Sequence, residues 1–113
     1  MPKGSSSRLT REDLIARRFR TGEVELSEGG TVAVRGLTRA EVQEAQRLAD
    51  ADDGLPRDRY LIAYGLTDPV MSPEDVDVWA ANAPAGDTVR VEDKIAELSG
   101  LKDTQPKEDY KSV

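Results

Sequence analysis

Residues 23–42 read EVELSEGGTVAVRGLTRAEV, and this stretch decides the fold because it joins a β-hairpin signature to the start of a helix. Apolar and polar residues alternate over residues 23–26 and 31–34, which is the period of a strand with one buried face. Between them, Ser27-Glu28-Gly29-Gly30 can supply the positive φ angles of a tight turn. The stretch therefore predicts a hairpin at about 23–35.

The apolar face of this hairpin needs a partner, because an isolated hairpin is marginal in water. One face carries four apolar side chains: Val24, Leu26, Val32 and Val34. We expect this face to pack on helical residues, for which the candidates are Leu14, Val42 and Ile62.

Three helix starts share one capping pattern. A Ser or Thr precedes the helix, an acidic residue stands at the third helical position, and apolar residues flank the cap on both sides. The pattern occurs at Thr10, Thr38 and Ser72, and Pro73 follows Ser72 at a position where its missing N–H costs nothing. We predict helices from these caps, the second over about 38–50 and the third over about 73–82.

Two further helices follow from the spacing of apolar residues. One is predicted over about 57–65, stopped by a turn at Thr67-Asp68-Pro69. The other is predicted over about 87–99, with Gly100 as its C-terminal stop. The expected fold class is α+β and mostly α, with four to five short helices and one small β-hairpin near the N-terminus.

The apolar periodicity extends over residues 9–101, which predicts a single small α-rich domain of that extent. Residues 1–8 and 102–113 are polar and lack such periodicity. They bury too little apolar surface to offset chain entropy, so we expect them to be flexible tails.

Composition excludes several classes of protein. The 113 residues include no Cys and no His, which excludes disulfides, thiolate metal sites and Ser–His or Cys–His catalysis. No stretch approaches the ~20 apolar residues of a membrane span, and no apolar run follows Lys3 as it would in a secretory signal. We therefore expect no membrane partner and no export.

Charge is distributed unevenly along the chain, whose net charge is −6. Residues 1–57 carry 10 basic and 10 acidic side chains, whereas residues 58–113 carry 6 and 12. The acidic half repels phosphate, so we expect no nucleic-acid partner. The basic residues near the N-terminus are diluted by Glu12 and Asp13, and we interpret them as a solvated helix face. They are Arg8, Arg11, Arg17, Arg18 and Arg20.

The acidic residues do not form a recognisable catalytic or metal motif. Residues 50–54 (DADDG) lack both the acidic alternation and the later Glu of a calcium loop. The pairs Asp52/Asp53 and Glu74/Asp75 fall in a loop and in a first helical turn, where they do not predict a pocket for acid–base work. We predict a protein that is not an enzyme, holds no cofactor or metal and acts by binding other proteins.

Four apolar residues are the candidate protein-binding residues. The lone tryptophan, Trp79, suits an interface because aromatic side chains anchor interfaces, although Trp at helical spacing is also typical of a core. The last predicted helix has an apolar face at i, i+4 and i+7, which suits a core as well as a partner. The candidates are Trp79, Val91, Ile95 and Leu98.

Four segments, taken in order, carry a resemblance to a known family. They are residues 9–16 (LTREDLIA), 32–42 (VAVRGLTRAEV), 65–76 (GLTDPVMSPEDV) and 95–101 (IAELSGL). With these segments the chain resembles, over residues 9–101, the tail assembly chaperones of long-tailed (siphovirus-type) actinobacteriophages. In that family an N-terminal helix precedes a small hairpin, then an R-G-L-T-R-A-E helix, a G-L-x-D-P turn and two more helices.

The resemblance implies a function. Such proteins bind the long helical tape measure protein and keep it soluble while tail tube subunits polymerise around it. It also implies action in the host cytoplasm during infection, absence from the mature virion, and contacts with the tail tube protein or with a frameshifted longer form of the chain. A homo-oligomer remains open. The alternative is a small structural component of the virion, such as a head–tail connector or tail protein.

Overall fold

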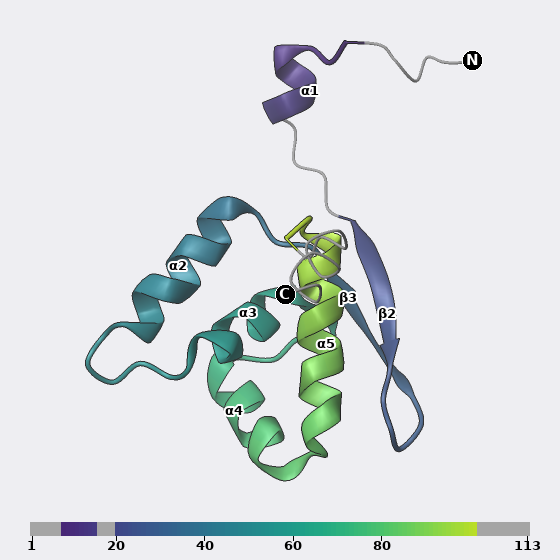
Figure 1. Ribbon diagram of the computed structural model, residues 1–113, viewed down its shortest axis with the longest axis vertical. Helices are drawn as coiled ribbons and strands as arrows, with labels where there is room; N and C mark the ends of the chain where they lie inside the picture. Colours follow the sequence, from purple (N-terminus) through teal and green to yellow (C-terminus); the bar gives the residue numbers. More distant parts are fainter. Residues whose placement is uncertain (1–7, 16–19, 102–113) are drawn as a thin grey trace, which may run out of the picture.

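The computed structural model describes residues 8–15 and 20–101 (Figure 1). Over these residues it contains five helices and three strands, which confirms the predicted α+β, mostly α fold class. The elements, in chain order, are α1 (Arg11–Ile15), β2 (Thr21–Glu25), β3 (Thr31–Arg35), α2 (Arg39–Ala49), α3 (Arg57–Gly65), β4 (Leu66–Asp68), α4 (Pro73–Asn82) and α5 (Ala85–Leu98). The expected tails lie almost wholly outside the described residues.

The predicted capping pattern forms at all three positions. The backbone N–H of Asp13 donates to Thr10 Oγ1, and the N–H of Thr10 donates back to Asp13 Oδ2, both at 3.0 Å. Thr38 and Ser72 make the same reciprocal bonds, with Glu41 and Asp75 respectively. These bonds satisfy backbone N–H groups that have no intrahelical partner, so short local sequences set the helix starts.

The end of α5 is likewise set locally. Gly100 has a φ of +79°, its N–H donates to the Glu97 carbonyl, and the N–H of Leu101 donates to the Ala96 carbonyl. This pair of bonds closes the helix in a Schellman motif, which needs a residue with positive φ. The helix itself begins at Ala85, two residues before the expected start.

The sheet has the strand order β2-β3-β4, with both pairs antiparallel. Val24 lies opposite Val32, and Gly29 and Gly30 both adopt positive φ in the loop between the strands, so the predicted hairpin is confirmed. The strand β4 is not among the predicted elements, because two of its three residues, Thr67 and Asp68, belong to the predicted turn. It pairs with Ala33 and Val34 on the far side of β3, so its pairing is a tertiary contact that local sequence does not encode.

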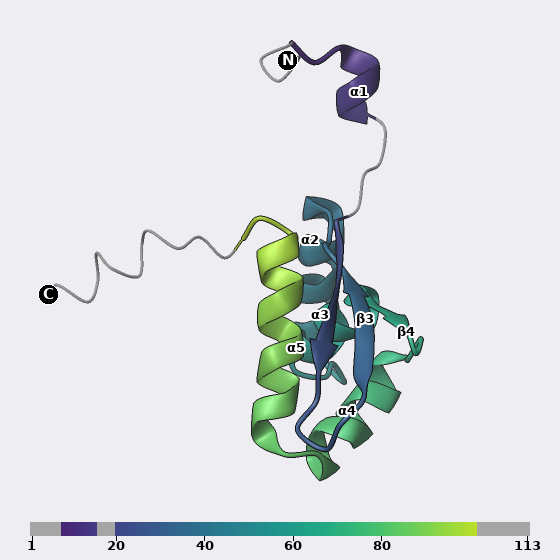
Figure 2. The same cartoon turned by 90° about the vertical axis from the view of Figure 1, so that its right-hand side faces the viewer.

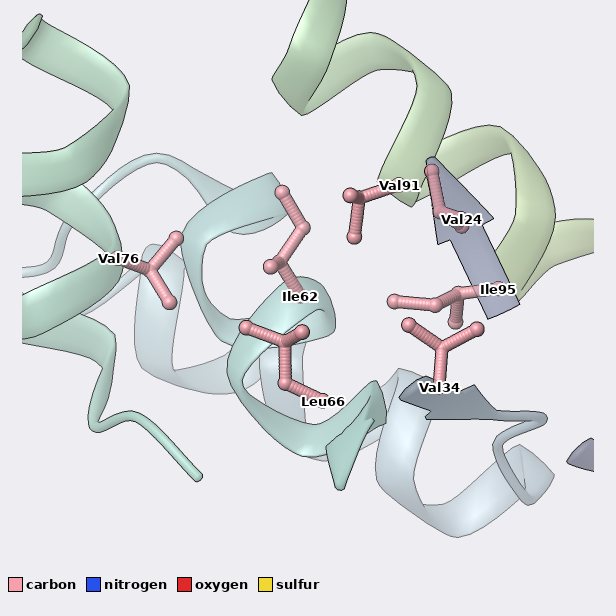
Figure 3. Packing of buried hydrophobic residues seen from close by; sticks show 7 residues of the cluster. All are labelled: Val24, Val34, Ile62, Leu66, Val76, Val91 and Ile95. Carbon is pink, nitrogen blue, oxygen red and sulfur yellow. The ribbon is translucent and has the colours of Figure 1, made fainter. Parts of the chain in front are cut away.

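The core lies between the sheet and the helices α3, α4 and α5. Seven residues form its buried cluster: Val24, Val34, Ile62, Leu66, Val76, Val91 and Ile95. Figure 3 shows Ile62 between Val76 on one side and Val91 on the other, with Ile95 facing Val34. Leu26 and Val32 are half-buried against this cluster, so the predicted apolar face of the hairpin packs on helices.

One expected partner of the hairpin is wrong. Ile62 does lie in the core, but the side chain of Leu14 is 71% exposed. Figures 1 and 2 show α1 standing apart from the rest of the domain, beyond the start of β2. Leu14 therefore has no access to the hairpin face, which α3 and α5 cover instead.

Candidate protein-binding surface

Two of the four candidate binding residues belong to the core. Val91 is 0% exposed and Ile95 is 2% exposed. The absence of a side chain at Gly65 allows α5 to approach α3, because a Cβ there would overlap the Ile95 side chain. The assignment of Val91 and Ile95 to a partner surface is therefore corrected: their i, i+4 spacing serves the packing of α5 on α3 and the sheet.

Trp79 packs at the edge of the core and lines an apolar hollow on the surface. The hollow has a volume of about 240 Å³, and its walls come from the hairpin, β4, the following loop and α4. Trp79 is half-buried, and it both packs against the core cluster and lines the hollow. We call this the Trp79 hollow; its lining residues are Leu26, Val32, Leu66, Pro69, Met71 and Trp79.

A second hollow adjoins the same tryptophan. It measures about 250 Å³ and is lined by Trp79 together with residues of the hairpin loop and of the α4–α5 connection. Its walls are more polar and include Glu28 and Asn82. Trp79 and Leu26 thus line both hollows, and an amphipathic partner could place apolar side chains in one and polar groups in the other.

The loop before α4 adds exposed apolar surface that sequence reasoning missed. Val70 is 80% exposed and lies between Pro69 and Met71, both of which line the Trp79 hollow. Val78, next to Trp79 on α4, is 63% exposed. The available signal was the apolar pair Val70-Met71 directly after a proline, in a segment interpreted only as a turn and a helix start.

Leu98 does not belong to the same surface. It is half-buried and lines a hollow of about 240 Å³ with Arg20 and Leu37. Leu98 is the last residue of α5, whereas the second hollow at Trp79 reaches Asp87 in the first turn of α5. A helix of 14 residues spans about 21 Å, so the two candidates lie at opposite ends of α5.

A buried carboxylate holds the hairpin loop beside the Trp79 hollow. Asp87 is only 3% exposed, and its two oxygens accept the backbone N–H and the hydroxyl of Ser27, each at 3.1 Å. Arg90 also donates to Asp87, at 2.5 Å. Burial acts to raise the pKa of Asp87, but the bonds from Ser27 and Arg90 outweigh it and lower that pKa below the usual 3.8. The ionised carboxylate therefore links α5 to the hairpin loop through Ser27, next to Leu26, which lines the Trp79 hollow.

These hydrogen bonds of the Asp87 carboxylate predict that the fold loses stability in acid. A carboxylate with a lowered pKa in the folded state contributes stability that is present above its unfolded pKa and is lost as the pH falls through the folded value. Asp87→Asn should therefore have a lower urea midpoint than wild type at about pH 7. The difference between the urea midpoints at about pH 7 and about pH 3 should also be smaller in this variant than in wild type. Asp52→Asn, on an exposed loop, controls for the change in net charge. An unchanged pH dependence in Asp87→Asn would contradict the assigned role.

The described residues, 8–15 and 20–101, hold no group of three or more His, Cys, Asp or Glu side chains that could bind a metal ion. Nor is any helix in that part of the chain both long and apolar enough to cross a membrane.

Comparison with known proteins finds no relative. No protein-family model matches the chain, and neither the curated proteins nor the solved structures contain a significant match.

Proposed function

We propose that this protein is a phage tail assembly chaperone that binds an amphipathic helical segment of a tape measure protein and keeps it soluble during tail tube assembly. The observation that carries the proposal is the Trp79 hollow, an apolar recess with an aromatic wall on the surface of a small acidic domain. Further support comes from the four sequence segments that resemble this family.

The chemistry of the hollow suits a helix as partner. Helical partners of this kind insert apolar anchors at i, i+3, i+4 and i+7 into a groove, and tryptophan is among the residues that contribute most to such interfaces. Val70 and Met71 extend the apolar surface beyond Trp79, while Glu28 adds a negative charge at the neighbouring hollow. A segment with an apolar stripe flanked by Lys or Arg would complement this surface.

The test is co-expression with a tape measure segment that aggregates alone, followed by pull-down. We expect the segment to become soluble and to stay bound at both about 0.15 M and about 1 M salt, because apolar contacts are not screened. Trp79→Ala should weaken binding about 30-fold, the effect of losing about 2 kcal/mol at a binding hot spot. Val89→Ala, at an exposed residue of α5 that lines neither hollow, should bind like wild type.

Because Trp79 also touches the core, a second variant separates binding from folding. Val70→Asp places a charge beside the hollow at a side chain that is 80% exposed, so it should weaken binding while far-UV circular dichroism stays unchanged. Full binding by both variants would refute this surface. No binding by wild type at either salt, together with a fixed copy number in purified virions, would favour the structural component.

A further inference from the structure

The strand β2 has an unpaired outer edge. It pairs with β3 on one side only, and Figures 1 and 2 show it at the margin of the described domain with no element across its other edge. It also contains neither a proline nor a bulge, which commonly block pairing at a sheet edge. The outer edge of β2 is therefore a template on which a further strand can pair.

The register of the hairpin shows which backbone groups face outward. The N–H of Leu26 donates to the Gly30 carbonyl, and the N–H of Gly36 donates to the Arg20 carbonyl, so the even-numbered residues of β2 bond to β3. The N–H and C=O groups of the odd-numbered residues point away from β3, and within residues 8–15 and 20–101 they have no hydrogen-bond partner. These residues are Thr21, Glu23 and Glu25.

The helix α5 already pairs with this edge at one point. Ser27 is the next residue in the outward-facing series, and its N–H donates to Asp87 Oδ1 at 3.1 Å. Asp87 stands in the first turn of α5, so its carboxylate takes the position that a carbonyl of a neighbouring strand would occupy. The outward groups before Ser27 run alongside the same helix and remain open.

A groove of about 680 Å³ lies between the edge of β2 and α5, and we call it the β2/α5 groove. Residues 23–27 form one wall, and four residues of α5 form the other: Arg90, Asp93, Lys94 and Glu97. Their i, i+3, i+4 and i+7 spacing places them on one face of the helix. This wall is about 10 Å long, which matches about three residues of an extended strand.

Charge selects a basic occupant. Arg90 and Lys94, the two cations of the groove, are each paired with an acidic residue of α5. Glu23 and Glu25 are exposed and form no ion pair with a described residue. A second copy of β2 would bring these glutamates together across the new pair, and like charges opposite each other destabilise a sheet. A strand with Lys or Arg at alternate positions would instead place a cation opposite each glutamate.

We propose that the β2/α5 groove binds an extended segment of a partner protein, with Lys or Arg at alternate positions, as a fourth antiparallel strand of the sheet. Its basic residues lie opposite Glu23 and Glu25, and the residue between them faces α5 on the same side as Val24. This ligand is a strand, whereas the proposed function concerns a helix at the Trp79 hollow. The inference therefore goes beyond that function and does not depend on it.

Backbone amide exchange in the full-length chain tests this pairing. The probe is a short synthetic peptide in which lysine and valine alternate. Saturation with the peptide should slow exchange of the Glu23 and Glu25 amides at least about 10-fold, because each gains a hydrogen bond. The amides of Gly22 and Val24, which bond to β3, should be protected with and without the peptide.

Two matched comparisons separate strand pairing from charge attraction alone. In the proposed register the lysine amides donate to β2 and the valine amides point away, so methylation of the lysine backbone nitrogens should abolish binding and methylation of the valine nitrogens should not. Glu23→Lys with Glu25→Lys should weaken binding at least about 10-fold, since both opposite-charge pairs become like-charge pairs. Asp52→Lys with Asp53→Lys makes the same change of net charge on an exposed loop and should bind like wild type.

Three results would overturn the proposal. The first is unchanged exchange of the Glu23 and Glu25 amides at the highest peptide concentration. The second is equal binding of the two methylated peptides, which would show attraction without strand pairing. The third is protection of these amides that rises with the concentration of the protein alone, since the occupant would then be β2 of a second copy.

Discussion

Replacing Val34 by aspartate is expected to remove most of the free energy that stabilises the fold. Val34 is 0% exposed, lies on the central strand β3 and faces Ile95 (Figure 3). The variant either buries a carboxylate without a partner or forces its protonation, and it also removes apolar contacts. The combined cost is about 4–5 kcal/mol, comparable with the lower end of the ~5–15 kcal/mol by which small domains are stable.

Urea unfolding followed by far-UV circular dichroism measures this effect. Val70→Asp is the matched control, since it makes the same chemical change at a side chain that is 80% exposed. We expect that variant to unfold within about 0.5 kcal/mol of wild type, the usual effect of surface substitutions. A Val34→Asp protein that unfolds like Val70→Asp would mean that the hairpin face is solvated and the core assignment is wrong.

Gly36→Ala is the second large expected effect, because the backbone of another element occupies the space that a side chain would need. Gly36 is buried, and a Cβ on it would lie 2.5 Å from the Leu98 carbonyl oxygen and 2.7 Å from the Leu98 carbonyl carbon. Its N–H also donates to the Arg20 carbonyl at 2.8 Å, which restrains it further. We expect a loss of about 3 kcal/mol, the upper end of the range for overpacking, since backbone cannot move aside as a side chain can.

Gly86→Ala is the matched control for this prediction and should have the opposite sign. Gly86 is exposed within α5, and its nearest neighbour to an added Cβ would be Arg90 Nη1 at 3.9 Å. Alanine there loses less chain entropy on folding and should stabilise the domain by about 0.5 kcal/mol. If Gly36→Ala does not destabilise the domain, the C-terminal end of α5 does not pack against the connection between β3 and α2 as described.

The candidate binding site was predictable only in part. Trp79 is recognisable from sequence because a single aromatic on an amphipathic helix is either a core residue or an anchor, and the structure shows it lining both core and hollow. Periodicity predicts Val91 and Ile95 as binding candidates because an apolar helical face looks the same in sequence whether it packs on its own domain or on a partner. Asp87 could not be found, since its partner Ser27 lies 60 residues away.

Sequence alone determined the elements whose stabilising contacts are local. The capped starts at Thr10, Thr38 and Ser72, the glycine turn of the hairpin and the stop at Gly100 all depend on bonds between residues at most five positions apart. Such bonds form wherever the right residues stand at the right spacing, so composition and order suffice to predict them.

Only the tertiary structure decided which apolar faces are buried in the core and which remain exposed to solvent. The pairing of β4 with β3 and the burial of Val91 and Ile95 each depend on residues far apart in the chain. Apolar periodicity predicts that a helical face is buried, but it does not predict which element covers that face. That depends on where two elements can approach closely, as α3 and α5 do where Gly65 contacts Ile95. The Trp79 hollow exists because the packing of these elements leaves a space that no local sequence pattern predicts.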